Sequence, residues 1–174
     1  MCGMPFDILV KTILEDYTNR RPKSESEWYG PWTAILTSFF PVGKGYLVTP
    51  QRKIVSDEDN TSIIPDFVIE VSKITTPPLD KRVVLIVEIK NTQHWPGKVS
   101  ALEDQLLKQT SAALADNAKD LVYYVMTIGP HWRYGVKYDN GQGLQYLIEW
   151  RNTIHDESSF KELIKLSEKI YDID

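Results

Sequence analysis

The stretch IPDFVIEVSKITTPPLDKRVVLIVEIK, residues 64–90, contains two segments that predict β-strands. In 64–72 the side chains alternate between two sets, the period of two that gives a strand two different faces. One set is Phe67, Ile69 and Val71, and the other is Asp66, Val68 and Glu70. In 82–90 the run Val-Val-Leu-Ile-Val is apolar on both faces, which predicts a central strand that is covered on each side.

Upstream of these strands the sequence predicts a helix and several shorter elements. The helix runs from about Pro5 to Asn19, because apolar residues recur there at helical spacing: Phe6, Leu9, Val10, Ile13, Leu14 and Tyr17. Charge, Ser and Pro accumulate over 21–31, which predicts a loop. The segment 32–40 is apolar and aromatic, so we expect it in the core as either helix or strand. A strand is expected over 46–49, followed by a polar turn over 56–62.

Downstream, the sequence predicts a second helix that follows the central strand closely. Ser100 and Glu103 form a capping-box pattern, which begins a helix that extends to about Ala115. The residues expected to face inward are Leu102, Leu106, Thr110, Ala113 and Leu114. The segment 121–128 then predicts another buried strand.

The last part of the chain predicts a hairpin and a final helix. The segments 132–138 and 144–150 flank Asn140-Gly141, a pair that is typical of tight hairpin turns. Ser159 and Glu162 form a second capping pattern, which predicts the beginning of a C-terminal helix.

The composition is that of an ordinary globular protein, with 42% hydrophobic and 25% charged residues among 174. A chain of this length can bury a core by itself, and no repeat or long linker divides it, so we expect one domain over residues 1–174. The apolar runs are too short to cross a bilayer, and the N-terminus lacks a signal-peptide pattern. We therefore expect an intracellular protein, cytoplasmic or nuclear, that does not bind membranes.

Cysteine and histidine usage restricts the kinds of metal site that the chain can form. Cys2 is the only cysteine, which excludes an intramolecular disulfide and a cysteine-based zinc site. The three histidines, His94, His131 and His155, lack the His-x-x-x-His spacing of zinc hydrolases. Any metal ion must therefore be held mainly by oxygen atoms.

The net charge of −4 argues against a protein that coats nucleic acid through an overall positive field. A local basic patch is still compatible with this charge, and Lys98 and Lys108 lie in sequence beside the expected site. The alternative is that these lysines are ordinary solvated charges on a helix surface.

Three charged residues at the two central strands suggest phosphodiester chemistry. Asp66 stands at the beginning of one strand and Glu88 at the end of the next, so on neighbouring strands their carboxylates could converge on one Mg²⁺ or Mn²⁺. Lys90 follows Glu88 by two residues and projects from the same face. Phosphodiester cleavage needs a cation, an activated water and usually a positive side chain near the phosphate. The alternative is chance occurrence, but charges that continue a buried run are costly unless they form a site.

The pattern Pro65-Asp66 followed by Glu88-Ile89-Lys90 resembles the PD-(D/E)XK nuclease-like superfamily. The separation of 22 positions between the two acids, the two strands and the following helix are similar to that family over about residues 5–130. The resemblance implies an α/β fold with a restriction-endonuclease-like αβββαβ core, a mixed sheet flanked by helices, to which the hairpin and C-terminal helix are additions. It also implies that Asp66 and Glu88 bind Mg²⁺ or Mn²⁺, and that Lys90 positions or activates the attacking water.

The resemblance extends to further positions. Some members carry a glutamine on the following helix that orients the site or contacts nucleic acid, and Gln105 lies on the matching helix; a polar residue bordering an apolar stripe is the alternative. Where some members have a tyrosine four residues later, this chain has Gln109, so the exonuclease pattern is incomplete. For an acidic residue on the first helix, the candidates are Glu15, which faces away from the apolar stripe, and Asp16.

Together these features predict a metal-dependent nuclease that hydrolyses phosphodiester bonds of nucleic acid, with DNA favoured over RNA. The alternative is a catalytically inactive module of the same fold that binds protein or nucleic acid. Compact nucleases often dimerise, so the resemblance leaves a homodimer open. The aromatic residues Trp95, Trp132 and Tyr134 are expected to serve packing ahead of base stacking.

Overall fold

The computed structural model describes residues 6–55, 62–72, 76–115 and 120–173. Its helices are α1 (Ile8–Arg20), α2 (Tyr29–Phe39), α3 (Val99–Ala115) and α4 (Glu157–Asp172), with short 3-10 turns η1 (Glu25–Trp28), η2 (Val42–Lys44) and η3 (Thr92–His94). Its strands are β1 (Tyr46–Pro50), β2 (Ile54–Val55), β3 (Ser62–Ile63), β4 (Phe67–Val71), β5 (Arg82–Lys90), β6 (Leu121–Ile128), β7 (His131–Tyr138) and β8 (Gln145–Tyr146).

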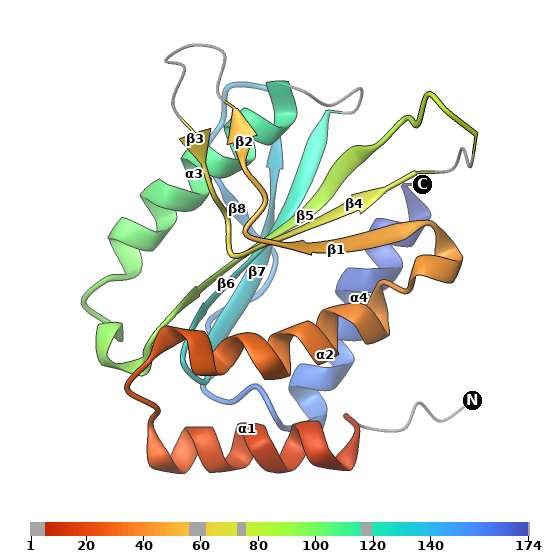
Figure 1. The fold of residues 1–174 in the computed structure, drawn as a ribbon. Coiled ribbons are helices and arrows are strands. Elements are labelled where there is room, and N and C mark those ends of the chain that lie inside the picture. The colour runs from red at the N-terminus through yellow and green to blue at the C-terminus, as the bar shows by residue number, and fades with distance from the viewer. Residues whose placement is uncertain (1–5, 56–61, 73–75, 116–119, 174) are drawn as a thin grey trace.

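Six strands form a mixed sheet in the order β1-β4-β5-β6-β7-β8, and β2 pairs with β3 separately. Strand β5 is antiparallel to β4 but parallel to β6. Because parallel neighbours need a crossover connection, α3 carries the chain from β5 to β6 across one face of the sheet (Figure 1). The fold is therefore α/β, with a six-stranded mixed sheet flanked by helices, consistent with the predicted restriction-endonuclease-like arrangement.

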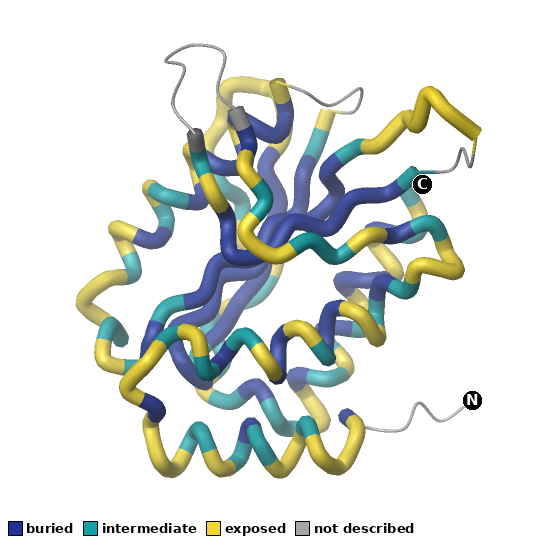
Figure 2. Tube along the Cα trace, in the orientation of Figure 1, coloured by how far each residue is buried: buried dark blue, intermediate teal, exposed yellow. Residues whose placement is uncertain are grey.

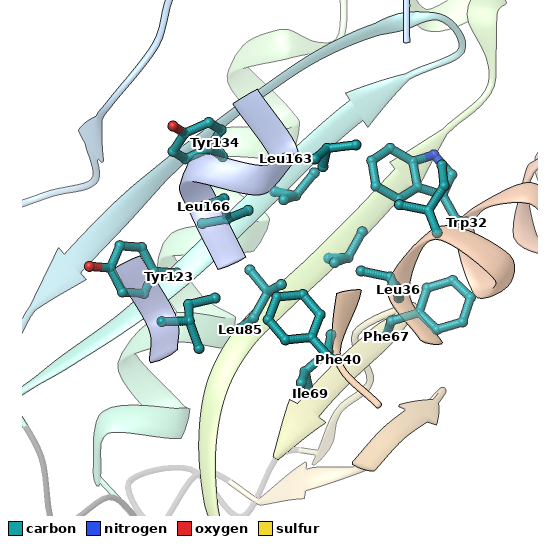
Figure 3. Packing of buried hydrophobic residues seen from close by; sticks show 14 of the residues in the cluster. Trp32, Leu36, Phe40, Phe67, Ile69, Leu85, Tyr123, Tyr134, Leu163 and Leu166 are labelled. Atoms are coloured by element: carbon teal, nitrogen blue, oxygen red, sulfur yellow. The ribbon is translucent and has the colours of Figure 1, made fainter. Parts of the chain in front are cut away.

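The sheet has two differently covered faces (Figure 1). Helices α2 and α4 pack on one face, where the larger apolar cluster includes Trp32 and Leu36 of α2 and Leu163 of α4 (Figure 3). Helix α3 packs on the other face, where Leu102 and Leu106 contribute to a second cluster. Figure 2 shows that the central strands between the two helical layers are buried along most of their length.

Strand β5 has the central position that its apolar pattern predicted, because residues 83–89 are all buried. Its side chains divide between the two clusters, with Leu85, Val87 and Ile89 in the larger one and Ile86 in the cluster beneath α3. Glu88 has the same alternation as Ile86 and therefore faces α3.

The first two helices differ in part from the expectations. Helix α1 begins at Ile8 and ends at Arg20, and Leu14 is buried as expected. Leu9 was assigned wrongly to the buried stripe, because 64% of it is exposed. The segment 32–40 is mostly helical, and α2 begins earlier, within the expected loop 21–31.

Both predicted helix caps are wrong in position. Helix α3 begins at Val99, so Ser100 is already helical, and Glu103 accepts a hydrogen bond from the Tyr146 hydroxyl instead of closing a capping box. In α4 the cap is Asp156, whose Oδ1 accepts a hydrogen bond from Ser159 N at 2.7 Å. A short acidic side chain at the cap position can accept a hydrogen bond from the backbone N–H groups of the first turn as well as a serine hydroxyl can.

The hairpin is present but shorter than predicted. Strand β7 spans His131–Tyr138, whereas β8 has only two residues, Gln145 and Tyr146, followed by an isolated bridge between Trp132 and Arg151. The expected polar turn over 56–62 lies almost wholly outside the described residues. Within the described part of the chain, none of the helices has the length and apolar character needed to cross a membrane.

Candidate active site

The pairing of β4 with β5 brings Asp66 and Glu88 side by side. Phe67 pairs with Val87 in the antiparallel register, so Asp66, one residue before Phe67, lies opposite Glu88. Asp66 Oδ2 accepts a hydrogen bond from Ile89 N at 2.6 Å, and Asp66 N donates to Glu88 Oε2 at 3.3 Å. Each acid is thus fixed by the backbone of the other strand. The two carboxylates could converge only if their strands were neighbours, and β4 and β5 are neighbours in the sheet.

Asp66 lies in a mostly buried position, with 8% of the residue exposed. Its Oδ1 accepts a hydrogen bond from the hydroxyl of Tyr29, in the first turn of α2. Burial raises the pKa of Asp66, and this effect outweighs the hydrogen bonds from Tyr29 and Ile89 N, which favour the charged form. Burial and the neighbouring carboxylate also raise the pKa of Tyr29, so its hydroxyl remains a donor.

Glu88 is more deeply buried, at 2% exposure, and its two oxygens accept four hydrogen bonds. Oε1 receives Lys90 Nζ at 2.9 Å and Gln105 Nε2, while Oε2 receives Gln109 Nε2 at 2.9 Å and Asp66 N. Burial, followed by the charge of Asp66, raises the pKa of Glu88 despite these donors. The two acids therefore share a site where negative charge is costly.

Lys90 provides the positive charge at this site. Its ammonium lies 2.9 Å from Glu88 Oε1 and 4.0 Å from Glu25 Oε2, and its side chain is 24% exposed. Burial alone would lower the pKa of Lys90, but the charge and hydrogen bond of Glu88, followed by the charge of Glu25, outweigh it and raise the pKa. Lys90 is therefore an ammonium that lies between the buried carboxylates and solvent.

The structure brings all four predicted residues, Asp66, Glu88, Lys90 and Gln105, into one hydrogen-bonded group. Gln109 joins them: it is fully buried and contacts Glu88 directly, from the position where the exonuclease pattern has a tyrosine. One helical turn separates the two glutamines, so both amides face the same carboxylate.

Sequence reasoning missed Glu25 and Tyr29, because the segment 21–31 was interpreted as a loop. Glu15 and Asp16, the acidic candidates on the first helix, form ion pairs on α1 itself, with Lys11 at 3.8 Å and Arg20 at 3.1 Å. The acid near the site is Glu25, in η1, and burial raises its pKa more than the charge of Lys90 lowers it.

A sequence signal for this region does exist. Trp28, Trp32, Ile35 and Leu36 recur at helical spacing and are all buried. Extending the helical pattern back to Trp28 would have placed Glu25, three residues earlier, about one turn before it on the same face.

A pocket with a volume of about 320 Å³ opens beside the group. Its polar lining consists of Lys90 and Gln105, which contact Glu88, together with Glu25, His94 and Lys98. Ala101 and Leu102 of α3 complete its lining.

The donor set fits Mg²⁺ or Mn²⁺ in kind, because two adjacent carboxylates with raised pKa values would be stabilised in their charged form by a divalent cation. Among the described residues, no group of three His, Cys, Asp or Glu side chains is close enough to hold a metal ion. Water, backbone or substrate oxygens would therefore have to supply the other ligands. Both Oε1 donors, Lys90 and Gln105, also compete with any ion for Glu88.

The aromatic residues mainly serve packing, as predicted. Trp132 and Tyr134 belong to the larger apolar cluster, and Trp95 stacks on His131 with ring centroids 4.0 Å apart. Arg133 is 7% exposed and lies over the Tyr146 ring.

Comparison with known proteins gives a likeness in fold. No protein-family model matches the chain, and no curated protein matches it. A chain in the cryo-EM structure of a DrdV–DNA complex is similar to it, with a TM-score of 0.51 and 10% sequence identity over 92% of this chain. This chain spans only 14% of the length of that one. At this identity the likeness concerns the fold alone.

Proposed function

We propose that this protein is a PD-(D/E)XK-type nuclease that uses Mg²⁺ or Mn²⁺ to hydrolyse phosphodiester bonds of nucleic acid, DNA ahead of RNA. The observation that carries the proposal is the buried contact between Asp66 and Glu88 with Lys90 on the same face. Burying two carboxylates is costly even where hydrogen bonds and one ammonium partly compensate their charge, so such a group within the sheet supports a role beyond packing.

Each residue of the group would have a distinct role. A bound Mg²⁺ or Mn²⁺ would neutralise charge on the phosphate and favour deprotonation of a water. Asp66 and Glu88 would hold the ion, and Lys90 would orient the attacking water or a phosphate oxygen. Gln105 would help to orient Glu88, to which it already donates a hydrogen bond.

Two supporting residues would keep the acids in position. Tyr29 donates to Asp66 from α2, and Gln109 donates to Glu88 from α3. Because these donors come from opposite sides of the sheet, the geometry of the acids depends on both helical layers.

The preference for DNA over RNA has separate support, which is the similarity in fold to a chain from a DNA complex.

Cleavage of plasmid and single-stranded DNA with either ion tests this proposal. Wild-type protein should nick the plasmid, and Lys90→Ala and Asp66→Asn should each lower the rate on the order of 10²–10³-fold, the usual loss for a group that stabilises charge in a transition state. Lys169→Ala is the matched control, since Lys169 is an exposed lysine on α4. Circular dichroism would establish that each variant is folded, and undiminished cleavage by both site variants would rule the assignment out.

One observation favours the alternative, an inactive module of this fold that binds protein or nucleic acid. Both oxygens of Glu88 are already occupied by protein donors, and Lys90 supplies a cation to the site without a metal. Calorimetric titration with Mn²⁺ separates the two functions: the nuclease binds the ion, and this binding is lost in Asp66→Asn. Absence of Mn²⁺ binding, with and without DNA, would favour the inactive module.

A further inference from the structure

The pocket beside the carboxylates contains positive charge that the site itself does not neutralise. Lys90 lies between Glu88 and Glu25 and is compensated by both. Lys98, which also lines the pocket, is exposed and has no ion pair or side-chain hydrogen bond within the part of the chain that the structure describes. An exposed cation that lines a pocket next to buried acids can attract an anionic ligand.

Backbone contacts fix the position of Lys98. Lys98 N donates to the carbonyl of His94 at 2.9 Å, and His94 N donates to the carbonyl of Asn91 at 3.0 Å. Between them, Trp95 stacks on His131 and also contacts the edge of Trp150, with centroids 4.8 Å apart. The segment that carries His94 and Lys98 is therefore anchored on the hairpin while both residues line the pocket.

The dimensions of the pocket exceed those of a single ion. Its volume of about 320 Å³ lies at the lower end of the range for sites that hold small molecules, roughly 300–1,000 Å³. Ala101 and Leu102 give it an apolar portion, whereas Lys98 and His94 give it a polar side. A nucleotide combines these two characters, because the faces of its base are largely apolar and its phosphate is anionic.

We propose that this pocket binds a nucleotide adjacent to the scissile phosphate on the same nucleic acid strand, with Lys98 binding the phosphate of that nucleotide and His94 contributing a hydrogen bond. The inference rests on the proposed function, because it takes the cleaved bond to lie at Asp66, Glu88 and Lys90. It assigns Lys98 to substrate binding, and it implies that substrates with a phosphate flanking the cleaved bond bind more tightly than those without one.

The salt dependence of binding tests this inference without any cleavage. Fluorescence anisotropy with a labelled oligonucleotide, in EDTA, would give the slope of log affinity against log salt for wild type, Lys98→Ala and Lys169→Ala. Loss of one phosphate contact should reduce the magnitude of the slope by about 0.7 for a single strand or about 0.9 for a duplex. The control Lys169→Ala should retain the wild-type slope, and equal slopes for all three proteins would overturn the inference.

A substrate with one uncharged linkage locates the contact. A methylphosphonate would be placed, one position at a time, at each linkage that flanks the mapped cleavage point. At the linkage that Lys98 contacts, wild-type protein should lose affinity while Lys98→Ala should show no further loss. If the two proteins lose equal affinity at every position, Lys98 does not bind a flanking phosphate.

The two proposals can fail separately. If the wild-type protein cleaves nucleic acid in the presence of metal but Lys98→Ala keeps the wild-type salt slope, the nuclease proposal stands and the pocket assignment is rejected. A reduced slope in Lys98→Ala, without cleavage under any metal condition, would retain the nucleic acid contact and reject the nuclease. Absence of nucleic acid binding by wild-type protein would overturn the pocket assignment outright.

Discussion

The two faces of the central sheet are formed by the same strands but bury different kinds of side chain. On the face beneath α2 and α4, Ile89 packs in a cluster of apolar residues. One residue earlier, Glu88 turns to the α3 face, where it contacts Lys90 and two glutamines. Buried ion pairs often contribute less stability than apolar residues of similar volume. The contrast indicates that one face mainly stabilises the fold, whereas the other retains polar groups at a cost that the proposed site would explain.

The largest effect is expected from a substitution on the apolar face, in the stability of the fold. Trp32 is completely buried in α2, and its ring lies against Trp132 with centroids 6.5 Å apart. Trp32→Ala should lower the free energy of unfolding by roughly 3–5 kcal/mol, because it removes a large buried side chain and leaves a cavity. Urea denaturation followed by tryptophan fluorescence or circular dichroism measures this change, and a loss below about 1 kcal/mol would contradict the assignment of this face to stability.

The next largest effect is expected on the polar face, in the affinity for Mn²⁺. Gln109→Leu removes the hydrogen bond to Glu88 Oε2 and should weaken Mn²⁺ binding about 10–100-fold, the usual cost of losing a residue that orients a metal ligand. Calorimetry measures the Mn²⁺ affinity.

The neighbouring residue provides a matched control for this variant. Thr110 is equally buried, but its hydroxyl bonds only to the α3 backbone, at Leu106 O and Leu107 O. Thr110→Val should therefore leave the Mn²⁺ affinity unchanged. Equal affinities for Gln109→Leu and wild type would show that Gln109 only packs.

A smaller effect concerns the helix that covers the apolar face. Burial alone would raise the pKa of Asp156, but hydrogen bonds from Thr153 and Ser159 outweigh it and lower the pKa. Since the folded-state pKa is below the unfolded one, the stabilisation is present above the unfolded pKa and is lost as pH falls through the folded pKa. Asp156→Ala should cost about 1 kcal/mol at neutral pH.

Thermal or urea unfolding at several pH values measures this dependence. The difference in the free energy of unfolding between wild type and Asp156→Ala should shrink steadily on acidification, because the variant lacks the charged cap. A difference that stays constant from neutral to strongly acidic pH would show that the charge of Asp156 does not stabilise α4.

The smallest effect separates two acidic residues that precede the site in sequence. Glu25→Gln removes a carboxylate 4.0 Å from the Lys90 ammonium and should alter the cleavage rate. Glu15→Gln changes an exposed pair with Lys11 on α1 and should leave the rate within error of wild type. Steady-state cleavage of a labelled oligonucleotide compares them, and the reverse order of effects would restore Glu15 as the site residue.

The central strands could be predicted from the sequence because their patterns carry the information locally. The apolar run of β5 indicated burial on both faces, and the position of Glu88 and Lys90 at its end placed them on one face. Gln105 was placed correctly on the following helix by its position after the strand. These predictions depended on periodicity, which a single sequence contains.

The parts that were missed depend on contacts between distant segments. Tyr29 and Glu25 reach the site from a segment rich in charge and Pro, where local composition favoured a loop. Gln109 was judged only by its departure from a family pattern, although an amide can also donate to a buried carboxylate. The helix starts were misplaced by one to three residues because several polar side chains near a helix end can cap it.

Soaking a crystal of the protein in Mn²⁺ and recording anomalous diffraction tests the central claim most directly. We expect one peak in contact with carboxylate oxygens of both Asp66 and Glu88, with the ammonium of Lys90 displaced from Glu88 Oε1. A map without a peak at this position, in which Lys90 and Gln105 still donate to Glu88 as they do here, would contradict a metal-dependent site between β4 and β5.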